Sequence, residues 1–389
     1  MRSLRSPVRS PFPAAAISLS MLLLACGSDS TPSGAGTTSA GTTTTSGSTG
    51  TGGAAGTGGA GGSGGMSPTP GKDATVTAFD KTHIYFTGDD NQRTVDADTD
   101  FPAEGAYSSI ILHLALSCPA GGCDPWDRFG ALSVVTEKGM NGAPDTEIEI
   151  ARFITPYHVG GSWDLDVTDL RPLLSGKLTM RAFIDTWVGP GSNFGAGWAL
   201  SASFEMKGGV PEKEPIAVVP IWTRRSVVYG DPAKPIVMAA PPAMVSLPQA
   251  SSYAMRTFIT GHGQGNASNC AEFCGKKHTL TAGNTPHTEK VWRADCATTA
   301  VPNQQGTWKF SRAGWCPGAD VKPWVIDVTA DVAGSSTASF IYDVEAYENT
   351  CRPDAMPCKG CTLGASCDYD GGTHTEPNYQ VSSLLIAYR

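Results

Sequence analysis

Residues 178–187 read Leu178-Thr-Met-Arg-Ala-Phe-Ile-Asp-Thr-Trp187, and apolar and polar side chains alternate along this stretch. One face carries the side chains of Leu178, Met180, Ala182 and Ile184. The other face carries those of Arg181, Phe183, Asp185 and Trp187. A period of two residues predicts a β-strand with one buried face. Asp185 and Trp187 should therefore lie side by side, directed away from the core.

Further strands are expected on both sides of this stretch. Residues 110–116 alternate in the same way, and residues 146–154 and 163–167 also have the composition of strands. The 389 residues include 46 glycines and 28 prolines, and long helical patterns are missing. This composition favours an all-β chain, and its length is sufficient for two domains with separate cores.

A short internal repeat indicates how these domains are arranged. Trp163-Asp-Leu-Asp-Val-Thr168 returns as Trp324-Val-Ile-Asp-Val-Thr329, and a strand-like run follows each copy. The repeat predicts two β-sandwiches of one topology in tandem. The pattern breaks at Lys-Gly-Gly-Val-Pro-Glu-Lys-Glu in residues 207–214. We therefore place the domains at residues 73–209 and 210–389.

The N-terminus has the features of an export signal. Arg2, Arg5 and Arg9 precede an apolar stretch, residues 14–25, that is too short to span a bilayer as a stable helix. It ends in Leu-Leu-Ala-Cys26, which resembles the lipobox of bacterial lipoproteins. The resemblance implies a signal peptide at residues 1–25 and an acylated Cys26 on the outer membrane or cell surface. An ordinary cleaved signal, in which Cys26 has no role, is the alternative.

The next segment, residues 26–72, consists almost entirely of Gly, Ser, Thr and Ala. Such a segment cannot bury a core and is expected to be a flexible tether. Removing the three N-terminal arginines from the 28 basic residues leaves 25 against 36 acidic ones, a net charge of −11. A chain this acidic, without a basic stripe, is not expected to bind nucleic acid.

The cysteine count agrees with export. If Cys26 carries lipid, ten of the eleven cysteines remain, an even number that suits an oxidising compartment. Cys351, Cys358, Cys361 and Cys367 lie close together in the sequence. Two disulfides of undetermined pairing are expected there, and a zinc site is the alternative.

Candidate site residues first appear in Cys118-Pro-Ala-Gly-Gly-Cys-Asp-Pro-Trp-Asp-Arg128. Cys118 and Cys123 can close a small disulfide loop. Asp127 follows this loop between Trp126 and Arg128. A neighbouring cation should hold the carboxylate ionised, and the indole offers an apolar face to a sugar ring. The alternative is an Asp-Arg pair at the end of a strand beside a core Trp.

A second acid occupies a similar setting in the other half of the chain. Cys270-Ala-Glu-Phe-Cys274 places Glu272 inside another small Cys loop, next to Phe273. Further on, Ser311-Arg-Ala-Gly-Trp-Cys-Pro-Gly318 contributes Arg312 and Trp315. With Asp185 beside Trp187, three acids have aromatic or Arg neighbours. This pattern indicates a site built on carboxylates.

These motifs together resemble the peptide-N-glycosidase F family, from about Thr75 to the C-terminus. Their order and spacing agree with the family, as do those of five further motifs: residues 77–81, 151–157, 166–169, 173–176 and 217–220. The resemblance implies two tandem eight-stranded antiparallel jelly rolls with the site at their interface. It also implies hydrolysis of the linkage between an Asn side chain and the innermost N-acetylglucosamine, on N-glycosylated peptides or proteins.

The resemblance further implies a role for individual residues. The catalytic group would be Asp127, Glu272 and Asp185, the last standing where the family has Glu. The substrate-binding group would be Arg128, Trp187, Arg312, Phe273, His262 and Trp126, with Phe273 and His262 in place of Trp. The implied disulfides are Cys118–Cys123, Cys270–Cys274 and Cys296–Cys316. Residues 351–372 look like an insertion with disulfides of its own.

Other functions remain open at the level of sequence. A non-catalytic glycan-binding jelly roll would need the aromatic and Arg residues but not three acids. A glycoside hydrolase would also use two carboxylates, but would cut a sugar–sugar bond. A copper monooxygenase needs clustered His, and the seven His show no HH or HxH pair. We expect no metal, no cofactor and a monomer.

Overall fold

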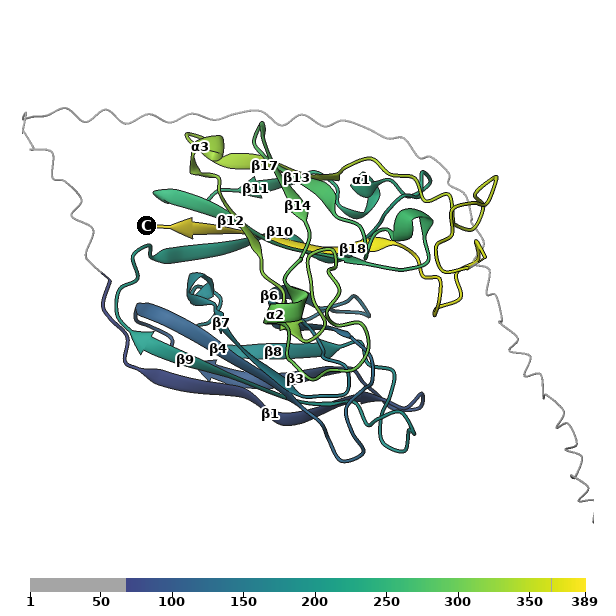
Figure 1. Ribbon diagram of the computed structural model, residues 1–389. Helices are drawn as coiled ribbons and strands as arrows, with labels where there is room; N and C mark the ends of the chain where they lie inside the picture. The colour runs from purple at the N-terminus through teal and green to yellow at the C-terminus, as the bar shows by residue number, and fades with distance from the viewer. Residues whose placement is uncertain (1–67, 365) are drawn as a thin grey trace, which may run out of the picture. The chain divides into compact units, whose positions relative to one another are not determined.

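The computed structural model describes residues 68–364 and 366–389. They form two β-sandwiches, drawn in purple to teal and in green to yellow in Figure 1. The predicted signal peptide, Cys26 and all but the end of the predicted tether lie outside the described residues. Within the described part of the chain, no helix is long and apolar enough to cross a membrane.

The first sandwich consists of two five-stranded sheets. One sheet, in the order β2-β1-β9-β4-β7, contains β1 (Ala74–Phe86), β2 (Asn91–Gln92), β4 (Tyr107–Ser117), β7 (Gly161–Asp166) and β9 (Trp198–Gly208). The other, in the order β15-β6-β5-β8-β3, contains β3 (Thr94–Phe101), β5 (Phe129–Glu137), β6 (Thr146–Ile154), β8 (Gly176–Ile184) and β15 (Ala319–Asp320). The last of these strands comes from the second half of the chain.

The second sandwich consists of two four-stranded sheets. One contains β10 (Pro215–Val228), β18 (Asn378–Tyr388), β12 (Ser252–His262) and β16 (Trp324–Asp327), in that order. The other contains β11 (Ala243–Ser246), β17 (Thr337–Val344), β13 (Lys276–Ala282) and β14 (Thr285–Val291), in that order. Short helical turns connect strands: η1 (Thr168–Leu170), α1 (Ile236–Ala239), η2 (Ala267–Asn269), α2 (Cys296–Thr299) and α3 (Thr329–Val332).

Both sandwiches have jelly-roll topology. Without the short strand β2 and the added strand β15, the sheets of the first sandwich run β1-β9-β4-β7 and β3-β8-β5-β6. The sheets of the second run β10-β18-β12-β16 and β11-β17-β13-β14, which is the same order by position in the chain. The prediction of two tandem antiparallel jelly rolls is confirmed.

The internal repeat lies at equivalent places in the two sandwiches, at the end of β7 and of β16. Asp166 Oδ1 accepts the Thr168 amide at 2.9 Å, and Asp327 Oδ1 accepts the Thr329 amide at 3.0 Å. Each threonine hydroxyl then accepts a backbone N–H, Thr168 from β4 and Thr329 from β12. The repeated Asp-Val-Thr therefore supplies local side-chain bonds that turn the chain out of the strand.

The alternation in residues 178–187 also agrees with the structure. Met180, Ala182 and Ile184 are buried in the first core, and the Trp187 side chain is 54% exposed. Strand β8 ends at Ile184, so Asp185 and Trp187 lie just beyond it. The inward and outward alternation nevertheless continues through these two residues. The candidate acid thus lies at the end of a strand that the core holds in place.

The two sandwiches are joined by main-chain and side-chain contacts. Strand β15 pairs with β6. From β6, the guanidinium of Arg152 forms a bidentate pair with Glu149, with both N–O distances 2.7 Å. It also donates to Thr260 Oγ1 at 3.0 Å and to the Gln380 carbonyl at 2.7 Å, both in the second sandwich. Arg152 is fully buried, and its charge is paired and hydrogen-bonded. These bonds hold β6 of the first sandwich to β12 and β18 of the second.

The ordered fold begins earlier than the tether prediction implied. The predicted tether extends to residue 72, but the Ala106 amide donates to the Thr69 carbonyl at 2.9 Å. The Gly71 amide donates to the Ala106 carbonyl at 2.8 Å. The last residues of the predicted tether are thus part of the first sandwich, because backbone bonds to a neighbouring segment do not depend on side-chain type.

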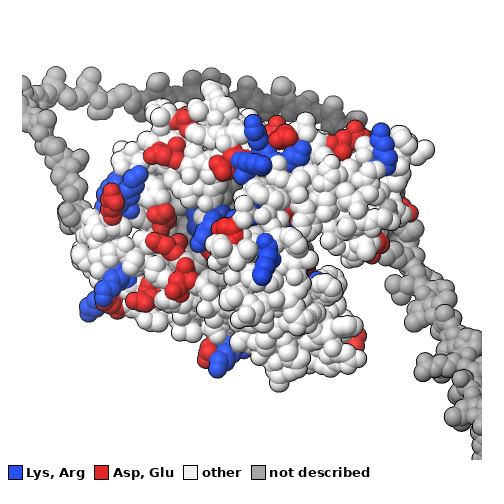
Figure 2. Space-filling model, viewed as in Figure 1, with Lys and Arg blue, Asp and Glu red and all other residues white. Residues whose placement is uncertain are grey.

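The cysteines of the described residues form five disulfides. Three are the implied pairs, Cys118–Cys123, Cys270–Cys274 and Cys296–Cys316. In the insertion the pairs are Cys351–Cys361 and Cys358–Cys367, which answers the pairing left open by the sequence. On the face drawn in Figure 2, acidic and basic side chains are interspersed.

Candidate functional site

Asp127 is held at the point where the Cys118–Cys123 loop leads into β5. The Tyr157 hydroxyl donates to Asp127 Oδ2 at 2.6 Å. Arg312 Nη2, from the second sandwich, lies 3.6 Å from the same oxygen. The Asp127 side chain is mostly buried, with 17% of its surface exposed. Groups from both sandwiches therefore fix the carboxylate at their junction.

Glu272 contacts the same arginine from the other side. Arg312 Nε donates to Glu272 Oε1 at 3.1 Å. Its Nη1 donates to the carbonyls of Thr307 and Phe310, and its Nη2 donates to Thr307 Oγ1 at 2.9 Å. Only 1% of the Arg312 side chain is exposed. Arg312 thus bridges the two carboxylates as a buried cation whose donors are used within the protein.

Burial and mutual repulsion shift the proton affinity of this pair. Burial raises the pKa of Asp127, although Arg312 and the Tyr157 hydrogen bond oppose the change. Burial, followed by the nearby charge of Asp127, raises the pKa of Glu272 to about 7, again opposed by Arg312. The two groups titrate as one coupled system with a proton to exchange near neutral pH. Such a pair is suited to acid–base chemistry.

Arg128 has a different partner from the one expected. The sequence suggested that Arg128 keeps the neighbouring Asp127 ionised; its charge does act to lower the pKa of Asp127, but less than Arg312 and Tyr157 do, and burial outweighs all three. Arg128 Nε donates to Asp124 Oδ2 at 2.8 Å. Asp124 is fully buried and also accepts the Thr186 hydroxyl at 2.6 Å and the Trp126 amide at 3.0 Å. Asp124 therefore fixes both the backbone and the side chain of Arg128. The ion-pair partner of Arg128 in this motif is Asp124 and not its sequence neighbour Asp127.

An open cleft of about 610 Å³ begins at Asp127. It is lined by residues of both sandwiches: Asp127, Arg128, Phe129, Phe183, Asp185, Arg224, Arg225, Ser226, His262, Thr375, Asn378 and Gln380. Its volume lies in the range of small-ligand sites. The cleft brings together four of the predicted site residues, whereas Glu272 and Arg312 lie outside its lining.

Asp185 and Trp187 are on the same side of the chain, as predicted. Arg93 Nη1 donates to Asp185 Oδ1 at 3.2 Å. The Arg93 guanidinium also lies 4.4 Å from the centre of the Trp187 ring and 4.7 Å from that of Phe86. Among the described residues, no hydrogen bond or ion pair joins Asp185 to Asp127 or Glu272. Asp185 shares the cleft with Asp127 but belongs to a separate ion pair.

The remaining predicted residues occupy different parts of the site. The Phe273 ring lies 5.1 Å from the Arg312 guanidinium, outside the cleft lining. His262 stacks on Trp315 at 5.4 Å. Burial, and then the charge of Arg152, lowers the pKa of His262 to about 3, so its ring is neutral. Trp126 is 57% exposed and is thus available to a ligand.

Sequence reasoning missed Tyr157, Asp124 and Arg93. Tyr157 was inside a recognised motif, but the contact of its hydroxyl with Asp127 depends on tertiary structure. Asp124 directly follows a Cys loop, which was a usable signal. Arg93 comes from the turn before β3 and carries no local pattern that points to the site.

Family models match parts of both sandwiches. Residues 75–194 match the family model described as Peptide-N-glycosidase F, N terminal, and residues 238–360 match the C-terminal model. Peptide-N(4)-(N-acetyl-beta-D-glucosaminyl)asparagine amidase F of Elizabethkingia miricola is 29% identical over 327 residues, 80% of this chain and 83% of that relative.

Solved structures are similar over both sandwiches. The structure of PNGase F, a glycosylasparaginase from Flavobacterium meningosepticum, has a TM-score of 0.65 and 27% identity. The match covers 82% of this chain and 96% of that structure. PNGF-II matches with a TM-score of 0.59 at 16% identity, over 81% of this chain and 66% of that structure, and supports the fold alone.

Proposed function

The chain belongs to the peptide-N-glycosidase F family, and we propose that it hydrolyses the amide between an Asn side chain and the innermost N-acetylglucosamine of an N-linked glycan. The observation that carries this proposal is the Asp127–Glu272 pair, bridged by buried Arg312 where the cleft begins. The products are a 1-amino-N-acetylglucosamine glycan and a peptide in which Asp replaces Asn.

The two carboxylates have separate roles in this proposal. Glu272, with its pKa near neutral pH, takes a proton from a water molecule held between it and Asp127. The water oxygen adds to the amide carbonyl carbon, the carbon–nitrogen bond breaks, and the proton passes to the departing amine. Asp127 orients the linkage by accepting its N–H. Arg312 positions both acids and favours their ionised forms.

The cleft provides the binding groups for the glycan. Arg128 donates to Asp124 through Nε, and its two terminal nitrogens make no hydrogen bond to the described residues, so they can donate to sugar hydroxyls. The exposed rings of Trp187 and Trp126 offer faces for stacking on sugars. Asp185 from the first sandwich and His262 from the second both line the cleft. The resemblance placed Arg312 among the sugar contacts. In this proposal Arg312 mainly holds the two carboxylates in position, because its side chain is buried.

A release assay tests this function. Wild-type protein and Asp127→Asn are incubated with a denatured N-glycoprotein in the presence of a metal chelator, and free glycan is quantified. Wild type should release glycan, and the isosteric variant should lose release while keeping its fold. A wild-type protein that retains glycan at its surface without cleaving it would instead be a glycan-binding protein.

We also propose that Cys26 is acylated and anchors a monomeric enzyme to a membrane surface. The motif Leu-Leu-Ala-Cys26 and the long Gly-, Ser- and Thr-rich segment after it support this proposal. Metabolic labelling with a fatty-acid analogue should mark the wild type but not Cys26→Ser. Equal labelling of both proteins would contradict acylation at Cys26.

A further inference from the structure

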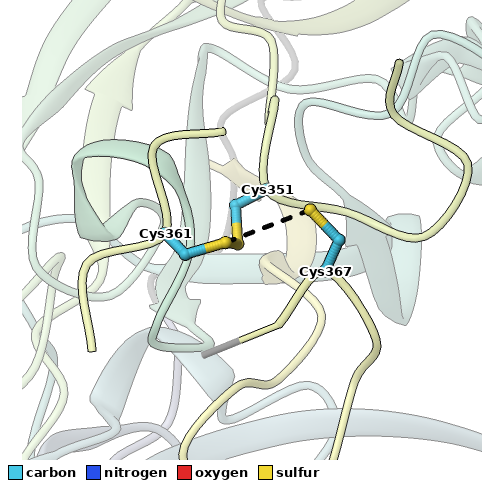
Figure 3. Close-up of side chains that lie close together, drawn as sticks. All are labelled: Cys351, Cys361 and Cys367. Carbon is cyan, nitrogen blue, oxygen red and sulfur yellow. Dashed lines mark hydrogen bonds between the residues drawn. A yellow bond between two sulfur atoms is a disulfide. The ribbon is translucent and has the colours of Figure 1, made fainter. Parts of the chain in front are cut away.

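The Cys351–Gly372 insertion lies against the loop that leads to Glu272. Its two disulfides are close together, and Cys361 Sγ lies 4.0 Å from Cys367 Sγ (Figure 3). The Thr362 amide donates to the Gly265 carbonyl at 3.1 Å, and the Thr362 hydroxyl donates to the Asn266 carbonyl. The insertion is therefore bonded to the loop formed by residues 263–269.

Two fully buried asparagines connect the insertion to this loop. Asn349 Nδ2 donates to Asn266 Oδ1 at 2.8 Å. Asn349 Oδ1 accepts the amides of Ala267 and Cys351, both at 3.1 Å. Asn266 Nδ2 donates to the Thr375 carbonyl at 2.9 Å. Loss of either side chain would leave buried polar groups without partners, which is costly.

The same loop is bonded to the wall of the cleft. The Thr375 amide donates to the Gln264 carbonyl at 3.0 Å, and the Thr375 hydroxyl accepts the Gln264 amide, also at 3.0 Å. Thr375 lines the cleft together with His262. Gly263 has a φ of +101°, and a Cβ there would lie 2.6 Å from the Glu376 carbonyl oxygen. The two segments are thus in contact along their backbones.

The loop also reaches Glu272 directly. The Glu272 amide donates to the Gly263 carbonyl at 3.4 Å. Burial and the charge of Asp127 raise the pKa of the Glu272 carboxyl most strongly, and Arg312 opposes them. A hydrogen bond from the Gly263 backbone also lowers this pKa. A continuous chain of bonds therefore runs from the insertion to the carboxylate.

We propose that the Cys351–Gly372 insertion is a brace that positions Glu272 and the adjoining cleft wall through Asn349, Asn266 and Thr375. This inference rests on the proposed function, because it assigns the insertion to the same site. Asn349 and Asn266 are positioning residues, since they act through the loop and not on the substrate. Loss of the brace should leave Glu272 less enclosed and less accurately placed.

The test compares Asn349→Ala with wild type under conditions where both are folded. Asn349→Ala should lower kcat more than it changes KM, by about tenfold to a hundredfold, because misplacement on the order of 1 Å has effects of this size. Greater access of water to Glu272 should also lower the pKa of its carboxyl, which is followed by carbon NMR without any substrate. The charged groups that act on Glu272 are Asp127 and Arg312, Tyr157 contacts both of these, and none of the three is altered in this variant.

The control for a general loss of stability is Val245→Ala, a substitution at a buried position in β11 of the second sandwich. It should leave kcat and the Glu272 titration unchanged. If Asn349→Ala does not fold, the pair Cys358→Ser and Cys367→Ser removes one disulfide and should give a smaller effect in the same direction. Wild-type kcat and an unchanged Glu272 titration in the folded variant would overturn the brace. Absence of glycan release by wild type would instead overturn the proposed function, and the NMR titration would still report on the brace.

Discussion

Glu272→Gln should abolish catalysis and at the same time remove a pH-dependent loss of stability. The neutral amide keeps the shape of the side chain and can still accept from Arg312 Nε. General-base catalysis contributes about a hundredfold to ten-thousandfold, so glycan release should fall by a factor in this range at pH values where wild-type Glu272 is ionised. In wild type, kcat/KM should rise as the pH passes through about 7, where Glu272 becomes ionised.

The stability effect follows from the raised pKa of Glu272, which is about 7 in the folded protein against an ordinary value of 4.5. Between these values the folded protein holds a proton on Glu272 that the unfolded chain has lost. Wild-type stability therefore decreases as the pH rises through this window. The difference corresponds to at most about 3 kcal/mol of unfolding free energy, at about 1.4 kcal/mol for each pH unit. Glu272→Gln lacks this contribution.

Urea unfolding of both proteins at several values between about pH 4.5 and pH 8 provides the measurement. The unfolding free energy of Glu272→Gln should rise relative to wild type across this range and level off above it. Protonation of His262 in the unfolded state lowers the stability of the folded protein as the pH falls below about 6.5. This loss is the same in wild type and Glu272→Gln, so it cancels in the difference between them. Glu289→Gln, at an exposed position in β14, should run parallel to wild type. If the unfolding free energies of Glu272→Gln and wild type changed with pH in parallel, the reasoning would be refuted.

Three further outcomes are expected. Tyr157→Phe removes the 2.6 Å bond to Asp127, which should raise the pKa of Asp127 further and lower kcat/KM about tenfold, and an unchanged rate would exclude this bond from catalysis. Asp185→Ala should lower turnover by up to about a hundredfold, and Asp185→Glu should also lower it because Arg93 already occupies the adjoining space. A wild-type rate for Asp185→Ala would leave only two acids in the catalytic group. Thiol titration of the denatured, unreduced mature domain should find essentially no free thiol, whereas four thiols appearing only after chelation would support a zinc site in the insertion.

The fold was predictable because its signals are local and regular. Alternation in residues 178–187 identified a strand with one buried face, and the Trp-x-x-Asp-Val-Thr repeat marked equivalent strands of two sandwiches. The added strand β15 was not predictable, because its two residues contribute to a sheet of the other sandwich. The end of the tether was misplaced because backbone bonds to Ala106 have no composition signal.

The sequence pointed to the two carboxylates that Arg312 bridges, but not to their partners Tyr157 and Arg312 in the folded chain. The small Cys loops identified Asp127 and Glu272, because each loop fixes an acid beside an aromatic residue. Adjacency in the sequence suggested an interaction of Arg128 with Asp127, but Arg128 forms its ion pair with Asp124. Arg312, which is distant in the sequence, bridges Asp127 and Glu272. Which cation pairs with which carboxylate depends on how the two sandwiches are joined. No local sequence pattern indicates how they are joined.

Digestion of a glycopeptide in water enriched in heavy oxygen tests the central claim most directly, with mass spectrometry of both products. If Asp127 and Glu272 direct water to the amide carbonyl, the heavy oxygen should appear in the newly formed Asp of the peptide. The glycan should leave as a glycosylamine before it hydrolyses in solution. A peptide that keeps an N-acetylglucosamine on unlabelled Asn would contradict the account and identify a glycosidase.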